Sequence, residues 1–279
     1  MTRLRESLVA AITAGVIGLA GTSAQADDTS PWVDDLHSSV RLIAGGHYSE
    51  ATGLLAGIEI KLKPGWHTYW RYPGDSGVPP HFSFPDSDNV AAVKVLYPAP
   101  HAMTDETGTT IGYTDDVVFP VLVTPRQKDK PVTLHLHVDY AVCEKMCVPV
   151  EAKTQLTLPG GSSATDAVIA AAEARVPKQV SAAQAGLKVH RANDAPKPLV
   201  AIDLAVPQGE PVQIFVEGPT PEWALPIPKP APGAPPGRQY FSFELDGLPP
   251  GVNPKESFEL TLTILRGKQQ PIEAKTRLD

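Results

Sequence analysis

Short apolar runs separated by turns rich in Gly and Pro fill the first part of the chain. Apolar and polar side chains alternate most regularly over residues 132–142, and this period of two predicts a half-buried β-strand. Further strands are predicted at residues 57–62, 91–96, 117–123 and 152–158. Short strands with regularly spaced turns predict an antiparallel sandwich or barrel.

The pattern changes at residues 161–186, which are rich in Ala, carry Thr165 and Asp166 as candidate caps and are interrupted by Pro177. These are features of short helices. Six more strand-like runs follow, at residues 187–191, 199–206, 212–217, 239–245, 258–265 and 271–278. We therefore predict an all-β protein, with one sandwich domain at residues 27–160, a helical linker at 161–186 and a cysteine-free sandwich domain at 187–279.

Residues 218–237 stand apart from these strands because eight of the twenty are proline. Proline lacks the N–H that a sheet requires and favours the extended polyproline conformation. We expect a solvated loop outside the sheets, and a recognition segment is the alternative.

The N-terminus has the features of a secretory signal peptide. Arg3 and Arg5 precede an apolar run at residues 8–21, and the small residues Ala24 and Ala26 form a cleavage site. The run is shorter than the roughly 20 residues that span a bilayer. We expect residues 1–26 to be removed by cleavage near Ala26, giving an exported protein with no stable membrane insertion.

Charge and cysteine content narrow the function classes. The chain has 24 basic and 31 acidic residues, a net charge of −7, and contains no basic block, so nucleic acid is not an expected partner. Two cysteines exclude a disulfide-rich scaffold and a four-thiolate metal site. Outside the cytoplasm, two nearby cysteines can form a lasting disulfide.

Cys143 and Cys147 are the strongest candidates for chemistry. In a straight strand they would lie about 13 Å apart, whereas a disulfide needs Cα atoms within about 7 Å, so the chain must turn between them. Closing so short a loop contributes only about 2 kcal/mol, which favours exchange chemistry over a structural cross-link. The alternation of the preceding strand puts Cys143 on the polar side, so we expect it to be accessible and to be the attacking residue.

A metal site is a weaker interpretation. His135 and His137 with Met103 and Met146 would suit Cu(I) together with the thiols. However, His137 lies about 20 Å from Cys143 along the strand, so we interpret these histidines as surface residues and expect neither metal nor cofactor.

The segment from Tyr140 to Pro149, with its two cysteines, resembles the N-terminal domain of the DsbD thiol:disulfide interchange family. Residues 65–71 (GWHTYWR) and the pair Tyr97-Pro98 add to the resemblance. It covers roughly residues 30–160 and is greatest to the ScsB-like copper-tolerance branch, whose exported portion has two sandwiches.

The resemblance implies an immunoglobulin-like sandwich in the periplasm, acting as a thiol:disulfide oxidoreductase module. It would take electrons from a membrane-embedded partner and reduce periplasmic thioredoxin-fold proteins, with Cys143 and Cys147 as the redox pair. Asp105 and Glu106 match an acidic pair in a loop that caps the cysteines, and a solvated loop is the alternative for them. The aromatic residues Tyr69 and Trp70 match positions near the cysteines, and core packing is their alternative.

Two departures from the family pattern affect the prediction. Three residues rather than five separate the cysteines, and Thr107 stands where the family has an aromatic cap residue. We expect donor and acceptor to be separate proteins, because these 279 residues contain neither a membrane channel nor a thioredoxin domain. Two alternatives stay open: a non-catalytic interaction or assembly protein with a local disulfide, and a Cu(I)-binding protein.

Overall fold

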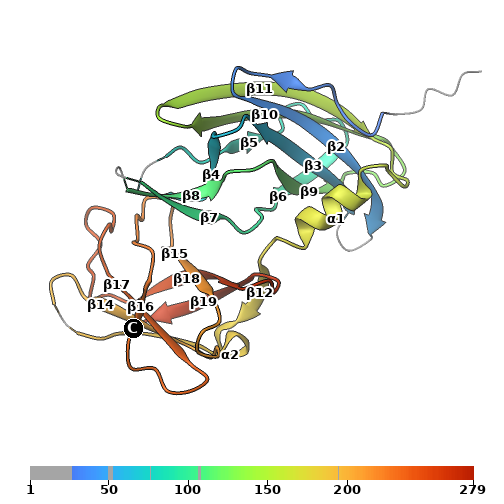
Figure 1. Cartoon of the computed structure of the whole chain (residues 1–279). Helices are drawn as coiled ribbons and strands as arrows, with labels where there is room; N and C mark the ends of the chain where they lie inside the picture. Colours follow the sequence, from blue (N-terminus) through green and yellow to red (C-terminus); the bar gives the residue numbers. More distant parts are fainter. Residues whose placement is uncertain (1–26, 50–52, 76, 106–107, 194) are drawn as a thin grey trace, which may run out of the picture.

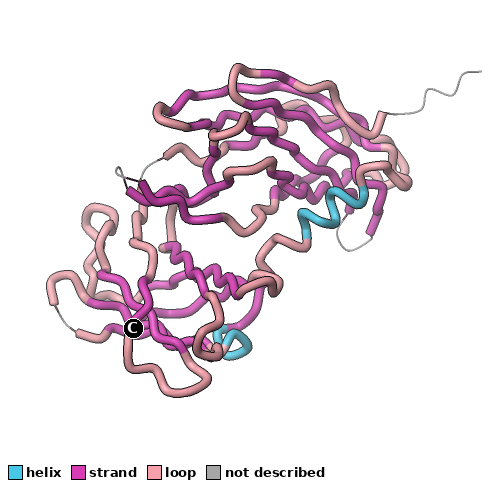
Figure 2. The backbone as a smooth tube through the Cα atoms, viewed as in Figure 1, coloured by secondary structure: helices cyan, strands magenta, loops and turns pink. Residues whose placement is uncertain are grey.

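The computed structural model describes residues 27–279, apart from 50–52, 76, 106–107 and 194. Two β-sandwiches follow one another along the chain and form the two lobes of Figure 1. Figure 2 shows that strands dominate both lobes, which confirms the predicted all-β class. The expected signal peptide, residues 1–26, lies outside the described residues.

The first sandwich packs a five-stranded sheet against a six-stranded one. The five-stranded sheet has the order β1 (Val33–Asp34), β2 (Ser38–Ser49), β3 (Gly53–Leu62), β9 (Val117–Pro125), β6 (Val90–Val95). The other has the order β11 (Cys147–Leu158), β10 (Val132–Cys143), β4 (His67–Gly74), β8 (Gly108–Tyr113), β7 (His101–Asp105), while β5 (His81–Ser83) pairs with β10.

The alternation predicted for residues 132–142 builds the core of this sandwich. The apolar side chains of β10 at every second position from Val132 to Tyr140 are buried, and they pack with Ile58 and Ile60 of β3. The pattern ends at Ala141, after which both faces of the strand are buried.

The second sandwich consists of two four-stranded sheets. One has the order β12 (Lys178–Ser181), β19 (Ile272–Leu278), β18 (Phe258–Arg266), β15 (Val212–Glu217). The other has the order β13 (Leu187–Arg191), β14 (Leu199–Leu204), β17 (Gln239–Glu244), β16 (Lys229–Ala231).

The segment predicted as a helical linker contains α1 (Asp166–Glu173) and α2 (Ala182–Ala185), but also β12, which pairs in parallel with β19. Thr165 makes no side-chain cap for α1; its hydroxyl donates to the backbone oxygen of Ala44 and so fixes the helix to β2. Part of this segment is therefore built into the second sandwich. Neither helix is long and apolar enough to cross a membrane, within the residues described.

The Pro-rich segment differs from the solvated loop that we expected. Residues Lys229–Ala231 form the edge strand β16, paired with β17. Proline is tolerated there because an edge strand leaves half of its backbone groups outside the ladder. Trp223 and Leu225 are buried in the core of the second sandwich, so the prediction was wrong because it weighed the prolines and not the apolar residues between them.

Residues of β4 hold the two sandwiches together. Arg71 donates hydrogen bonds to both carboxylate oxygens of Glu217, at 2.8 and 3.1 Å from Nε, and also binds Glu273. The hydroxyl of Tyr72 donates to the backbone oxygen of Leu225 at 2.7 Å. Phe215 of β15 is buried within the core cluster of the first sandwich, so the interface is apolar as well as charged.

Candidate functional site

The two cysteines close the β10–β11 hairpin. Cys143 is the last residue of β10 and Cys147 the first of β11, and the strand register places them directly opposite each other. They form a disulfide with a Cα–Cα distance of 4.2 Å. The predicted turn between them is confirmed, and it consists of Glu144, Lys145 and Met146.

The two half-cystines differ in exposure. Cys143 is only 3% exposed, whereas Cys147 is an exposed residue. The prediction that Cys143 is accessible was wrong, because β4 pairs with the end of β10 and brings His67 opposite Cys143. β4 also carries Tyr69, whose side chain packs against Cys143 and covers the face that alternation alone assigns to solvent.

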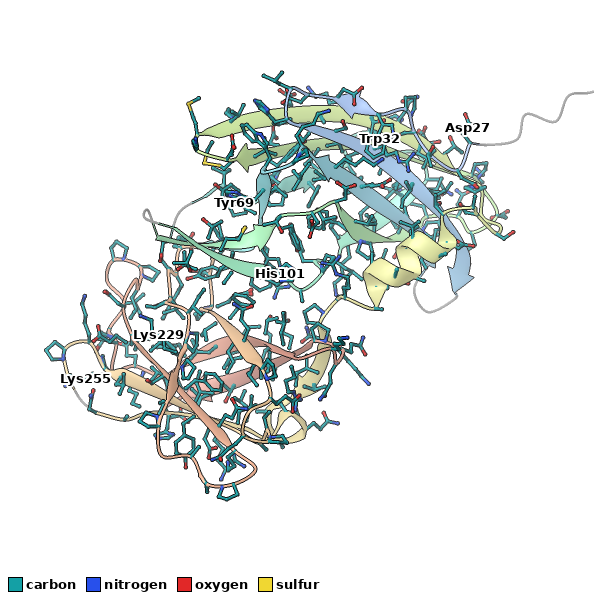
Figure 3. The ribbon with its side chains drawn as sticks, in the orientation of Figure 1. Asp27, Trp32, Tyr69, His101, Lys229 and Lys255 are labelled. Atoms are coloured by element: carbon teal, nitrogen blue, oxygen red, sulfur yellow. A yellow bond between two sulfur atoms is a disulfide. The ribbon has the colours of Figure 1, made fainter. Side chains whose placement is uncertain are left out.

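Tyr69 is the side chain that contacts both sulfurs. Its hydroxyl oxygen lies 2.6 Å from Cys143 Sγ and 3.1 Å from Cys147 Sγ, and Figure 3 shows the ring beside the disulfide. The residue is 2% exposed and packs in a small cluster with Ala141 and Cys143. A hydroxyl group can donate a hydrogen bond to a thiolate or contact a disulfide, and in both cases it adds no charge to the site.

The backbone at Gly77 lies close against the ring of Tyr69. A Cβ atom at Gly77 would lie 2.2 Å from the Tyr69 ring, and the backbone there has φ +133°. Only glycine adopts this conformation and permits such close approach at little cost. The loop that carries Gly77 therefore helps to hold the hydroxyl against the sulfurs.

Trp70, the second aromatic candidate, lies away from the disulfide. Its side chain is fully buried in the core of the first sandwich and its ring centroid lies 5.7 Å from that of Phe215. Successive residues of a strand point to opposite faces, so β4 directs Tyr69 to the sulfurs and Trp70 into the core. Once β4 was recognised as a strand, alternation could have shown that the two side chains point to opposite faces, but not which of them meets the sulfurs.

The acidic pair is placed only in part. Asp105 ends β7, where its backbone pairs with Gly108 of β8, while Glu106 lies outside the described residues. Sequence reasoning missed Asp75, whose carboxylate accepts a hydrogen bond from the Thr109 amide at 2.8 Å and so anchors β8 next to this loop. Its position just after Gly74, a turn residue with positive φ, was the available signal.

The methionines and histidines considered as metal ligands lie at different distances from the disulfide. Met146 in the turn is 72% exposed, next to Cys147. Met103 is half-buried on β7. His135 and His137 lie on β10 far from its cysteine end; within the described part of the chain, the group of metal-ligating side chains that includes His137 contains neither cysteine.

Comparison with known proteins agrees with this geometry. Residues 41–159 match the family model of the N-terminal part of thiol:disulfide interchange protein DsbD, which confirms the resemblance stated from sequence. The crystal structure of the N-terminal periplasmic domain of ScsB from Proteus mirabilis matches with a TM-score of 0.71 and 21% identity, covering 90% of this chain and 98% of that one. At this identity the likeness establishes the fold. No curated protein sequence matches the chain.

Proposed function

We propose that this protein is a periplasmic thiol–disulfide exchange module. The Cys143–Cys147 pair would relay reducing equivalents from a membrane-embedded donor to thioredoxin-fold acceptors. The observation that supports this most directly is the disulfide itself, which sits at the tip of a hairpin with one exposed and one buried cysteine. The match to the DsbD N-terminal family model supports the direction of electron flow.

The exposure of Cys147 makes it the reacting sulfur in this proposal, in place of Cys143. A donor thiolate attacks Cys147 Sγ, the intramolecular S–S bond breaks, and Cys143 leaves as a thiolate to which the Tyr69 hydroxyl donates. A second donor thiolate then attacks the donor sulfur of the mixed disulfide and releases Cys147. The pair gains two electrons and two protons.

The same groups act in reverse toward the acceptor. The Cys147 thiolate attacks the acceptor disulfide and forms a mixed disulfide, and one acceptor sulfur leaves as a thiolate. Cys143 then attacks Cys147 Sγ, which restores the hairpin disulfide and releases the second acceptor thiol. The cross-strand register supports this step because it keeps the two cysteines opposite each other.

Location and copper tolerance are further parts of the proposal. Cleavage of the expected signal peptide near Ala26 would deliver the module to the periplasm. The resemblance to the ScsB-like branch implies a role in copper tolerance, and the exposed thioether of Met146 beside Cys147 is a soft ligand for Cu(I). Cu(I) uptake by the reduced protein, compared with the double cysteine variant, tests this role.

Single-cysteine variants and the reduction potential test the relay. We expect Cys143→Ser to accumulate mixed disulfides through Cys147, and Cys147→Ser to form few because Cys143 is buried. Equilibration with glutathione should place the potential between about −270 and −120 mV, the range of exchange catalysts. A potential below about −300 mV, or equal trapping by both variants, would contradict the proposal.

A further inference from the structure

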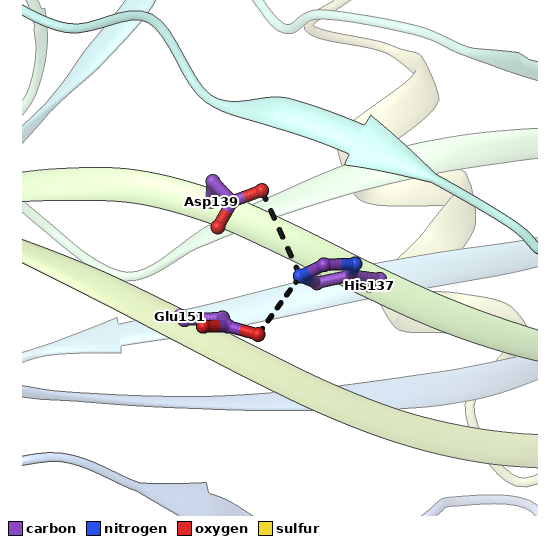
Figure 4. A group of neighbouring side chains, drawn as sticks. All are labelled: His137, Asp139 and Glu151. Atoms are coloured by element: carbon purple, nitrogen blue, oxygen red, sulfur yellow. Dashed lines mark ion pairs between the residues drawn. The ribbon is translucent and has the colours of Figure 1, made fainter.

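A second cluster of chemically active side chains lies on the same hairpin, apart from the disulfide. His137 and Asp139 come from β10 and Glu151 from β11, and their ligand atoms lie within 4.8 Å of one another (Figure 4). His137 Nε2 is 3.1 Å from Glu151 Oε1 and 3.7 Å from Asp139 Oδ2. Along the strands, the Asp139–Glu151 pair lies four residue pairs from the cysteines, about 13 Å, and His137 lies six, about 20 Å.

The register explains why two carboxylates meet here. Asp139 and Glu151 are direct cross-strand partners, and like charges in such a pair destabilise a sheet. On its other side, Asp139 pairs with His81 of β5, an exposed histidine on the same face. The sheet thus brings two carboxylates and two imidazoles together on its outer surface.

The imidazole of His137 lacks an aligned partner. The side chain is 30% exposed, but its Nε2 atom is shielded from solvent and forms ion pairs with Glu151 and Asp139 without an aligned hydrogen bond. A shielded polar atom without a hydrogen bond is unfavourable. A cation among the three side chains would use the nitrogen lone pair and neutralise the two carboxylates.

Lys153 supplies positive charge at one edge of the cluster. Its Nζ lies 2.6 Å from Glu151 Oε1. A cation bound by Glu151 therefore competes with Lys153 for the same oxygen.

We propose that His137, Asp139 and Glu151 bind one divalent first-row transition cation. Mixed imidazole and carboxylate donors suit Zn²⁺ and its neighbours, whereas Mg²⁺ and Ca²⁺ prefer oxygen ligands alone. In a tetrahedral zinc site with bonds of about 2.0–2.1 Å, ligand atoms lie about 3.3 Å apart. The two separations from His137 Nε2, 3.1 and 3.7 Å, bracket this value.

This site departs from the metal-free expectation drawn from the sequence. That expectation considered whether His137 could converge with Cys143 along one strand. The cluster instead combines His137 with Asp139, two residues away on the same strand, and with Glu151 on the paired strand. The site is independent of the relay and requires no redox chemistry.

Zn²⁺ titration of the protein with its disulfide formed tests the site, because the sulfurs are then excluded as ligands. Calorimetry should show one equivalent bound, with no displacement by excess Mg²⁺. His137→Gln and Glu151→Gln should each weaken binding by at least about tenfold, since even an outer partner of a zinc ligand contributes about 10- to 100-fold. Lys153→Met should strengthen binding several-fold by removing the competing cation.

His190→Gln is the matched control, because His190 is an exposed histidine on β13 of the second sandwich. It should bind Zn²⁺ as tightly as the parent protein. In the presence of a chelator, every variant should have the same unfolding temperature as the parent protein. This control distinguishes loss of a metal ligand from loss of the fold. Absence of saturable binding, or equal affinity in His137→Gln and the parent, would overturn the proposal.

Discussion

Two residues of β4, Tyr69 and Arg71, meet opposite chemical environments. Near the start of the strand, Tyr69 contacts the disulfide through a neutral hydroxyl group. Two residues later, Arg71 binds two carboxylates of the second sandwich, and Glu273 receives further hydrogen bonds from Gln179 and Thr263. One short strand therefore joins the disulfide to a dense ionic network.

The difference shows that the residues that fix β4 in place are not the residues that contact the reactive sulfurs. Burial opposes the charge of Arg71, but Glu217 and Glu273 outweigh it and raise the pKa of the guanidinium, so the network stays ionised and fixes the strand. The Tyr69 hydroxyl contacts both sulfurs of the disulfide and can donate a stronger hydrogen bond to a thiolate. Its position depends on the strand that the ionic network holds.

Arg71→Met should have the largest effect on this arrangement. Removing one partner of a buried ionic network leaves its carboxylates uncompensated, which costs about 3–5 kcal/mol; partial exposure of Arg71 reduces this to about 2–3 kcal/mol. We expect denaturant unfolding to separate into two transitions, one for each sandwich. Arg71→Lys keeps the charge without the bidentate geometry, so its stability should lie between those of the parent protein and Arg71→Met. A single unshifted transition in Arg71→Met would show that the network does not couple the lobes.

Gly77→Ala should disturb the contact between Tyr69 and the disulfide. A methyl group there meets the Tyr69 ring, and we expect a loss of about 1–3 kcal/mol from overpacking together with a shifted reduction potential. Gly251→Ala is the matched control, since Gly251 also has positive φ but nothing lies within 4 Å of its added Cβ. That control should lower stability by about 1 kcal/mol and leave the potential unchanged. Equal potentials in all three proteins would contradict the role of Gly77.

Hydrophobic patterns along the sequence predicted many of the strands but few of the contacts between residues far apart in the chain. The alternation in β10 and the apolar runs of the second sandwich correspond to strands because residues a few positions apart determine that pattern. β4 was missed as a strand because its aromatic and polar residues do not alternate by hydrophobicity. The burial of Cys143 follows from pairing with β4, which is a long-range contact that no local pattern contains.

The same limit applies to the site residues. Cysteine spacing predicted the hairpin disulfide, because a disulfide restricts the geometry between its ends. The sequence could not assign Tyr69 and Trp70 different roles without knowing which face of β4 meets the hairpin. It could not predict the ion pair between Arg71 and Glu217 either, since 146 residues separate them.

The two carboxylates that bind Arg71 allow a further test, in which the expected change in stability is smaller. Burial raises the pKa of Glu217, whereas Glu273 is also buried but has a lowered pKa because Arg71, Gln179 and Thr263 favour its ionised form. Ionised Glu273 thus stabilises the fold at pH above its unfolded pKa of about 4.3, and this stabilisation is lost as the pH falls through the folded pKa. The Glu217 contribution has the opposite sign and is lost as the pH rises through its folded pKa.

Glu273→Gln should therefore lower stability at pH 7 more than Glu217→Gln, by about 1–2 kcal/mol. We expect the difference to shrink as the pH falls below about 4, measured by urea unfolding across a pH series. Equal losses at pH 7, or a difference that grows in acid, would show that the two acids do not divide their roles in this way.

Tyr69→Phe should have the smallest effect on stability and act on the reduction potential. The lost hydroxyl no longer donates to the thiolate, and one hydrogen bond contributes about 1 kcal/mol, which corresponds to about 20 mV for a two-electron couple. Because the reduced state loses this stabilisation, the potential should become more negative. Tyr72→Phe is the matched control at the interface end of β4, where the hydroxyl binds Leu225 instead; it should lower stability and leave the potential unchanged. If both variants shifted the potential equally, the hydroxyl would act only through the position of the strand, and the disulfide site would not be chemically separate from the interface between the sandwiches.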